Sequence, residues 1–274
     1  MAQLLDNSDK IATGFRILYS FFNMGSPGKI EYNHIMTPCS KVVDPDPFRG
    51  HATLQAAAQD FRFFLSRGYP RKPCLDLVGN RYQLTSDQKN LLHRGVFSEK
   101  DSRSRKKKKL PSGRISGGDL AIDGYNVLIT VEAGLCGRPL IFGDDGFTRD
   151  ISGLSGNFRQ TETTKKALTL ILEGLKRYKP KRVLFLFDAP ISKSGELAEE
   201  VRRRLNEACL PGDAQAVKVP EHILVGYPGI IATSDTAVID TSEKVLDLAG
   251  HILKTRVKPK SMFRWTKRKI ISSR

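Results

Sequence analysis

Three apolar runs in the second half of the chain each end in an aspartate, and no other feature constrains the fold as strongly. The runs are LAID, VLFLFD and IIATSD, and their acids are Asp123, Asp188 and Asp235. The chain between the runs has helical periodicity, most clearly in residues 161–178. Short apolar runs that alternate with amphipathic helices are typical of parallel strands joined by crossover helices. We therefore predict an α/β domain over residues 119–253, with helices on both faces of a parallel sheet in a three-layer α/β/α fold.

The three aspartates are predicted to meet, because parallel strands bring their carboxyl ends to one edge of the sheet, where α/β proteins bind ligands. Asp240, which follows Asp235 in the same segment, is a fourth candidate acid. Carboxylates held together repel one another unless a cation offsets their charge. Ligands that are all oxygen favour Mg²⁺ or Mn²⁺, and such an ion binds phosphate and activates water. We therefore expect catalytic acids for phosphodiester hydrolysis; the alternative is that these aspartates only cap helices and turns.

The same residues carry a resemblance to a known group of proteins, the PIN and NYN nuclease superfamily. IDGYNVL is similar to the first strand of that superfamily, LFDAPIS to its central strand, and ATSDTAVID to its late motif. The resemblance implies that Asp123, Asp188 and Asp235 are metal ligands. It also implies that Asn126, which we take as a nucleic-acid contact too, supports the first site, and that Ser234 orients Asp235.

Two further groups of residues are candidates near the acids. The superfamily often takes a glutamate from a helix after its first strand, so the resemblance makes Glu162 the first candidate for a catalytic glutamate and Glu132 the second. Ser192, Lys193 and Ser194 start a polar helix after the second acid, where backbone amides can bind a phosphate of the nucleic acid. Simple helix capping explains these three residues equally well.

Residues 50–97 are predicted to form a small module of three helices. Its run AAAQDFRFFLSRGYPRKPCLDLVGNRYQLT resembles an uncharacterised, largely archaeal family, domain of unknown function 434, in which the module precedes a PIN-like domain with the same IDGYN, FDAPIS and TSD motifs. Packing against the α/β domain explains its apolar residues, and its basic residues can contact phosphate. The candidate nucleic-acid contacts in this module are Arg67, Arg71, Lys72 and Arg81.

Basic charge is concentrated on either side of the predicted α/β domain. The whole chain has a formal net charge of +16, from 45 Lys and Arg against 29 Asp and Glu. Residues 51–110 have fourteen basic and five acidic side chains, and residues 251–274 have nine and none, whereas residues 119–250 have sixteen and nineteen. This distribution favours a polyanionic partner, and nucleic acid ahead of a membrane surface. A role in solubility alone is the plainer alternative.

The remaining segments are predicted to have little structure of their own. Residues 98–118 read as a basic linker in which almost nothing is buried, and residues 254–274 as a basic tail. Residues 1–49 show no sustained periodicity and read as a poorly ordered extension. The four cysteines have no metal-binding spacing, and no run of about 18 apolar residues predicts a membrane span. We expect a cytoplasmic protein.

The leading hypothesis from the sequence is a ribonuclease that depends on Mg²⁺ or Mn²⁺. Its partner is expected to be RNA, with DNA left open as an alternative substrate and a homodimer left open as the oligomeric state. Two other hypotheses stand beside it: a catalytically inactive PIN-like protein that only binds RNA, and a hydrolase of small phosphate esters. Loss of RNA cleavage with retained binding after mutation of Asp123 would favour the nuclease, whereas activity on small esters alone would favour the last hypothesis.

Overall fold

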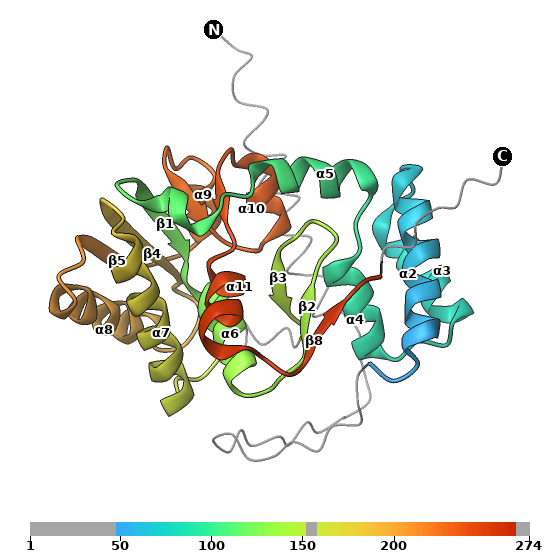
Figure 1. Ribbon diagram of the computed structural model, residues 1–274, viewed down its shortest axis with the longest axis horizontal. Coiled ribbons are helices and arrows are strands. Elements are labelled where there is room, and N and C mark those ends of the chain that lie inside the picture. The colour runs from blue at the N-terminus through green and yellow to red at the C-terminus, as the bar shows by residue number, and fades with distance from the viewer. Residues whose placement is uncertain (1–47, 152–157, 267–274) are drawn as a thin grey trace, which may run out of the picture. The chain divides into compact units, whose positions relative to one another are not determined.

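The computed structural model describes residues 48–151 and 158–266 of the chain (Figure 1). The predicted extension over residues 1–49 lies outside these ranges except for its last two residues. Four helices precede the first strand of the described part, one more than the sequence predicts, and they confirm a helical module ahead of an α/β domain. None of the helices in these ranges is long and apolar enough to cross a membrane. The four helices are α2 (His51–Ser66), α3 (Arg71–Arg81), α4 (Ser86–Gly95) and α5 (Glu99–Lys108).

The helical module shares its core with later parts of the chain. Leu54, Phe61 and Leu92 are buried in one cluster with Ile141 and Trp265. Burial of a side chain of this size is worth about 2 kcal/mol, and a module of three short helices can bury few of them alone. The module is therefore stabilised by packing on the rest of the protein.

The α/β domain is built on a five-stranded parallel sheet, which confirms the predicted fold class (Figure 1). The strands lie in the order β5-β4-β1-β6-β7, and every neighbouring pair is parallel. They are β1 (Asp119–Asp123), β4 (Arg182–Asp188), β5 (Gly212–Val217), β6 (Ile230–Ala232) and β7 (Val245–Leu246).

Helices cover both faces of this sheet. They are α6 (Gly124–Leu135), α7 (Glu162–Tyr178), α8 (Ser194–Glu207), α9 (Pro220–Leu224), α10 (Thr236–Thr241) and α11 (Leu248–Ile252). Ile122 of β1 packs in a cluster with residues of α6, α7, α8 and α11, whereas its neighbour Ala121 packs with residues of α9 and α10. Because successive side chains of a strand point to opposite faces, the sheet is the middle of three layers.

A second, three-stranded sheet connects the helical module with the α/β domain. Its strands lie in the order β3-β2-β8 and are β2 (Leu140–Phe142), β3 (Thr148–Asp150) and β8 (Met262–Arg264). Strand β8 belongs to the segment that the sequence predicts as a basic tail, so the structure differs from that prediction over residues 254–266. The reason is that Phe263 and Trp265, which are 4% and 9% exposed, complete the core of the helical module.

The segment predicted as a basic linker is also different, because it contains α5 and a short 3₁₀ helix, η1 (Ser112–Ile115). The Ser98 hydroxyl caps α5 by accepting a hydrogen bond from the Asp101 amide at 3.0 Å. On the inner side of α5, Arg105 is buried and donates two hydrogen bonds of 2.7 Å to the carboxylate of Asp240. A helix that is held by ion pairs has no apolar periodicity by which the sequence could reveal it.

Gly124 begins α6 directly after β1, and it leaves no room for a side chain. A Cβ atom at this position would lie 2.4 Å from Cε1 of Phe187 and 2.8 Å from the backbone carbonyl oxygen of Leu186. Because the backbone cannot move aside without disturbing the sheet, we expect Gly124→Ala to lower the free energy of unfolding by about 1–3 kcal/mol. Urea unfolding followed by circular dichroism measures this change.

The matched control is Gly195→Ala in the first turn of α8, where nothing lies within 4 Å of the added Cβ. This variant should unfold at the wild-type urea concentration or slightly above it, since alanine favours a helix more than glycine does. Equal stability of the two variants would contradict the close approach of α6 to β4.

Candidate functional site

The main sheet changes the direction of its connections at one point, between β1 and β6. From β1 the chain passes to β4 and β5 on one side, and it then returns to β6 and β7 on the other. In parallel α/β sheets, ligands bind outside the carboxyl ends of the strands at such a switch point. Asp123 is the last residue of β1, Asp188 is the last residue of β4, and Asp235 precedes α10 just after β6. All three predicted acids therefore lie at this edge of the sheet.

Thr233 connects two of the three acids. Its hydroxyl donates a hydrogen bond to Oδ2 of Asp123 at 2.8 Å, and its Oγ1 accepts one from the Asp235 amide at 3.0 Å. Asp123 also caps α6 by accepting a hydrogen bond of 3.4 Å from the Asn126 amide. Asp235 caps α10 by accepting two hydrogen bonds from the first amides of that helix. Asp123 and Asp235 therefore cap helices and also bring negative charge to this edge of the sheet.

Asn126 and Arg149 hold the loop that carries Asp235 from two sides. Oδ1 of Asn126 accepts hydrogen bonds from the amide and the hydroxyl of Ser234, at 2.8 and 2.9 Å. Nε of Arg149 donates to the Ser234 carbonyl oxygen at 2.7 Å, and the same guanidinium pairs with the fully buried Asp145 at 2.7 Å. Asn126 and Ser234 were candidates from the sequence, but Arg149 was not, because one arginine in a short strand gives no recognisable pattern.

Glu221 is a fourth acid at this edge, and the sequence analysis missed it. It lies in the first turn of α9, which starts soon after β5 ends and has only five residues. The charge of Asp235 acts on Glu221, and the charge of Glu221 acts on both Asp123 and Asp188. The available signal was Pro220, since a proline followed by a glutamate after a strand marks the first turn of a helix at the same edge.

Burial and the charges of neighbouring acids raise the pKa values of Asp123, Asp188 and Glu221. Burial raises the pKa of Asp123 to about 8; the hydrogen bond from Thr233 opposes this shift, and the charges of Asp235, Asp188 and Glu221 add to it. Burial, followed by the charge of Glu221, raises the pKa of Asp188 to about 6. The pKa of Glu221 is also raised, by burial first and by Asp235 next. The four acids therefore form one electrostatically coupled group, which we call the acid cluster.

The acid cluster fits a hard cation in its chemistry. It offers only carboxylate oxygens, the ligands that Mg²⁺ and Mn²⁺ prefer. Beside it, the Tyr125 hydroxyl is buried without a hydrogen-bond partner in the described residues, and burial together with the charge of Asp188 raises its pKa to about 12. A buried hydroxyl without a partner is consistent with a place for water or ligand. Among residues 48–151 and 158–266, no three Asp, Glu, His or Cys side chains stand close enough to hold an ion as they are, so ligation would require the carboxylates to turn toward a common point.

Glu162 and Asp240, the other predicted acids, are not brought to the acid cluster. Glu162 is the first residue of α7, and it pairs with Lys165 on the exposed surface. Asp240 lies at the far end of α10 from Asp235 and is held by Arg105. The second candidate for the glutamate, Glu132, is buried and accepts a hydrogen bond of 3.1 Å from Thr164. A position near the start of a helix does not fix which way a side chain points, so neither the resemblance that suggested Glu162 nor the place of Asp240 after Asp235 could show whether the side chain reaches the cluster.

The residues that start the polar helix after Asp188 have structural partners. Ser194 is buried, and its hydroxyl donates to the Ala189 carbonyl oxygen at 3.2 Å. Lys193 has a left-handed backbone conformation before α8 and pairs with Glu196 at 3.5 Å. Ser192 is exposed. These contacts engage Lys193 and Ser194 within the protein, although neither side chain caps α8, and phosphate binding there stays a prediction.

The basic candidates of the helical module divide into one structural residue and three surface residues. Arg71 donates to the carbonyl oxygens of Val96 and His93, and burial lowers its pKa to about 10. Arg67, Lys72 and Arg81 are exposed on the surface.

The raised pKa of Asp123 predicts how stability depends on pH. In the folded protein Asp123 binds its proton more strongly than in the unfolded chain, so its contribution to stability is complete below about pH 4 and is lost as the pH rises through about 8. Without divalent ions, the free energy of unfolding should therefore fall over this range. In Asp123→Asn the free energy of unfolding should fall less. Most of that fall should lie below the Asp188 pKa of about 6. Urea unfolding at a series of pH values in chelator measures both profiles, and identical profiles would contradict a buried acid cluster.

Comparison with known proteins places the chain in a family. Residues 112–251 match the family described as Domain of unknown function (DUF5616), and residues 53–108 match the one described as Protein of unknown function (DUF434), as the sequence led us to expect. An uncharacterized protein of Methanocaldococcus jannaschii, MJ0935, is 32% identical over 203 residues, which are 73% of this chain and 97% of that protein. No solved structure matches the chain. The chain therefore belongs to the DUF5616 family, with a DUF434 region ahead of that domain.

Proposed function

We propose that this protein is a nuclease that uses Mg²⁺ or Mn²⁺ to hydrolyse the phosphodiesters of RNA. The observation that carries the proposal is the acid cluster: Asp123, Asp188, Glu221 and Asp235 come from four separate elements and act on one another at the switch point of the sheet. Burying several carboxylates together destabilises a protein unless a cation compensates. A protein that only needed helix caps would not need four acids at one place.

The residues of the acid cluster would hold the ion through their carboxylate oxygens. When bound, a divalent ion neutralises charge on the phosphate and lowers the pKa of a bound water. The chain itself supplies orientation: Thr233 fixes Asp123 and the start of the Asp235 loop, while Asn126 fixes Ser234 from the other side. Second-sphere hydrogen bonds of this kind set the direction of a ligating carboxylate.

The charge of the chain favours a nucleic acid over a small ester as the substrate. With a formal net charge of +16, the protein attracts polyanions and raises their concentration near its surface. The carboxylates of the acid cluster would repel a phosphate, so a bound cation would be needed there for the substrate to approach. This combination of a basic surface with an acidic site suits cleavage of a nucleic-acid backbone better than hydrolysis of a small ester.

The experiment that tests the proposal is cleavage of end-labelled single-stranded and structured RNA by the purified full chain, with Mg²⁺, with Mn²⁺ and with chelator. We expect cleavage only with metal. Asp123→Asn and Glu221→Gln should each slow it about a hundredfold or more, because each removes a carboxylate that would position charge at the reacting phosphate. Glu221 is the sharper test, since the structure selects it and the sequence motifs do not.

The matched control is Glu162→Gln, which removes the exposed glutamate that pairs with Lys165 and should cleave at the wild-type rate. Loss of activity in Glu162→Gln but not in Glu221→Gln would contradict the acid cluster as the active site. No cleavage by the wild type, with RNA binding retained in every variant, would indicate an inactive RNA-binding protein. Turnover of small phosphate esters but not of RNA would indicate a phosphate-ester hydrolase.

A further inference from the structure

Helix α5 separates its basic side chains into two sets. The inner set holds the helix on the α/β domain: Arg105 pairs with Asp240 at 2.7 Å, Lys109 pairs with Asp247 at 2.9 Å, and Lys108 donates to the Asp240 carbonyl oxygen at 2.6 Å. These cations are engaged by protein acceptors, so they contribute to stability and are not offered to a ligand.

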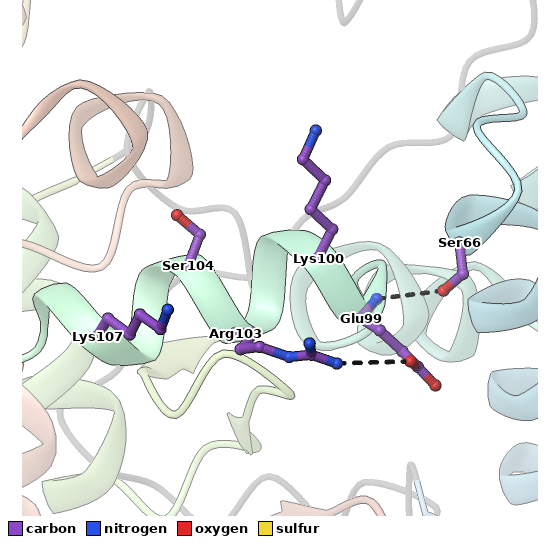
Figure 2. A pocket seen from close by; sticks show the side chains of 6 residues that line it. All are labelled: Ser66, Glu99, Lys100, Arg103, Ser104 and Lys107. Atoms are coloured by element: carbon purple, nitrogen blue, oxygen red, sulfur yellow. Dashed lines mark hydrogen bonds and ion pairs between the residues drawn. The ribbon is translucent and has the colours of Figure 1, made fainter.

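Within the described residues, the outer set forms no ion pair or hydrogen bond with the α/β domain. Lys100, Arg103 and Lys107 lie on one face of α5, because residues three, four and seven apart share a face of a helix. Together with Ser66, Glu99 and Ser104 they line an open pocket of about 480 Å³ (Figure 2). Glu99 is the single carboxylate of this lining, and it pairs with Arg103 at 4.0 Å. Lys100 and Lys107 form no ion pair within the described residues.

The row of charges has the dimensions of a short stretch of nucleic-acid backbone. Lys100 and Lys107 are seven residues apart, which corresponds to roughly 10 Å along a helix axis. Two exposed aromatic residues flank Ser66 in the chain, Phe63 and Tyr69, which are 53% and 56% exposed. The guanidinium of Arg67 lies 4.4 Å from the centre of the Phe63 ring, which leaves the other face of that ring for a base. Successive phosphates with unpaired bases beside them match a line of cations that ends at exposed rings, because bases stack on aromatic side chains.

A second pocket, of about 330 Å³, lies against another side of α5. It is lined by Asp101 and Arg105 of that helix, by Leu65, Gly68 and Tyr69 around the turn between α2 and α3, and by Arg71, Phe97 and Thr236. Thr236 directly follows Asp235, and the α10 helix that Asp235 caps is held by α5 through Arg105 (Figure 1). The second pocket therefore connects Tyr69, at the end of α2, with the residue that follows Asp235.

We infer that the outer face of α5 and the exposed rings at the end of α2 bind single-stranded nucleic acid. Lys100, Arg103 and Lys107 contact its phosphates, and Phe63 and Tyr69 stack on its bases. This inference rests on the proposed function, for which it supplies a binding face for the substrate. An acidic protein could pair with the same cations, but it has no bases to stack on the rings of Phe63 and Tyr69.

The test is the salt dependence of binding, measured by fluorescence anisotropy with labelled single-stranded RNA in chelator, so that no cleavage occurs. The substitutions Lys100→Gln, Arg103→Gln and Lys107→Gln are combined in one variant. The slope of log K against log salt concentration is negative. In the variant it should become shallower by about 2, since each phosphate contact on a single strand contributes about −0.7 to it. The control combines Lys166→Gln, Lys176→Gln and Lys181→Gln, which removes the same charge from exposed positions on and after α7 and should leave the slope unchanged.

Removal of the rings gives a second measurement. Phe63→Ala combined with Tyr69→Ala should weaken binding of single-stranded RNA about tenfold or more and leave binding of duplex RNA unchanged. Equal losses in the α5 variant and its control, or equal affinity of the wild type for polyglutamate of the same charge, would overturn the inference. Metal-dependent cleavage by the wild type, together with an unchanged slope in the α5 variant, would overturn the binding face but leave the proposed nuclease standing. A reduced slope without cleavage by the wild type would support the binding face and overturn the nuclease.

Discussion

The repulsion among four partly buried carboxylates is the constraint on which the rest of this structure depends. Burial makes Asp123 costly to ionise, and the charges of Asp188, Glu221 and Asp235 add to that cost. The fold keeps them together because each is fixed by its backbone position, three of them at or just after the ends of parallel strands. The order β5-β4-β1-β6-β7 brings those ends to one edge. Capping accounts for Asp123 and Asp235 singly, whereas the cost of keeping four acids together is the basis of the proposed cation.

A chain of buried ion pairs extends from this edge into the helical part of the protein. Arg149 holds the Ser234 carbonyl oxygen and pairs with Asp145, while Arg105 of α5 reaches both Asp145 and Asp240. Removing one partner of such a network leaves a buried charge without compensation, which is far more costly than losing an exposed pair. The helical module and the α/β domain are therefore coupled at the loop that carries Asp235, and this coupling explains why the basic helix stands beside the acids.

The sequence was informative where one physical rule determines a position. A strand that ends in aspartate sends that side chain to the carboxyl edge, so Asp123, Asp188 and Asp235 could be placed together without a structure. Glu221 was missed because α9 has five residues, too few for a helical pattern to be visible. Glu162 was suggested by the resemblance and Asp240 by its place after Asp235. The structure pairs Glu162 with Lys165 within α7, and it pairs Asp240 with Arg105, a tertiary contact that the sequence does not show. Helix α5 and strand β8 were missed because both depend on residues distant in the chain. Ion pairs hold α5 on the α/β domain, and Phe263 of β8 is buried in the core of the helical module.

Calorimetric titration of Mn²⁺ into the full chain at pH 7, in two buffers with different heats of ionisation, tests the central claim most directly. Asp123 has a pKa of about 8 without metal, so it must lose a proton when an ion binds, and binding should release about one proton. Asp123→Asn should lose both the tight binding and the proton release, while Glu162→Gln should keep both. Absence of Mn²⁺ binding, or binding that releases no proton and is unchanged in Asp123→Asn, would contradict the account.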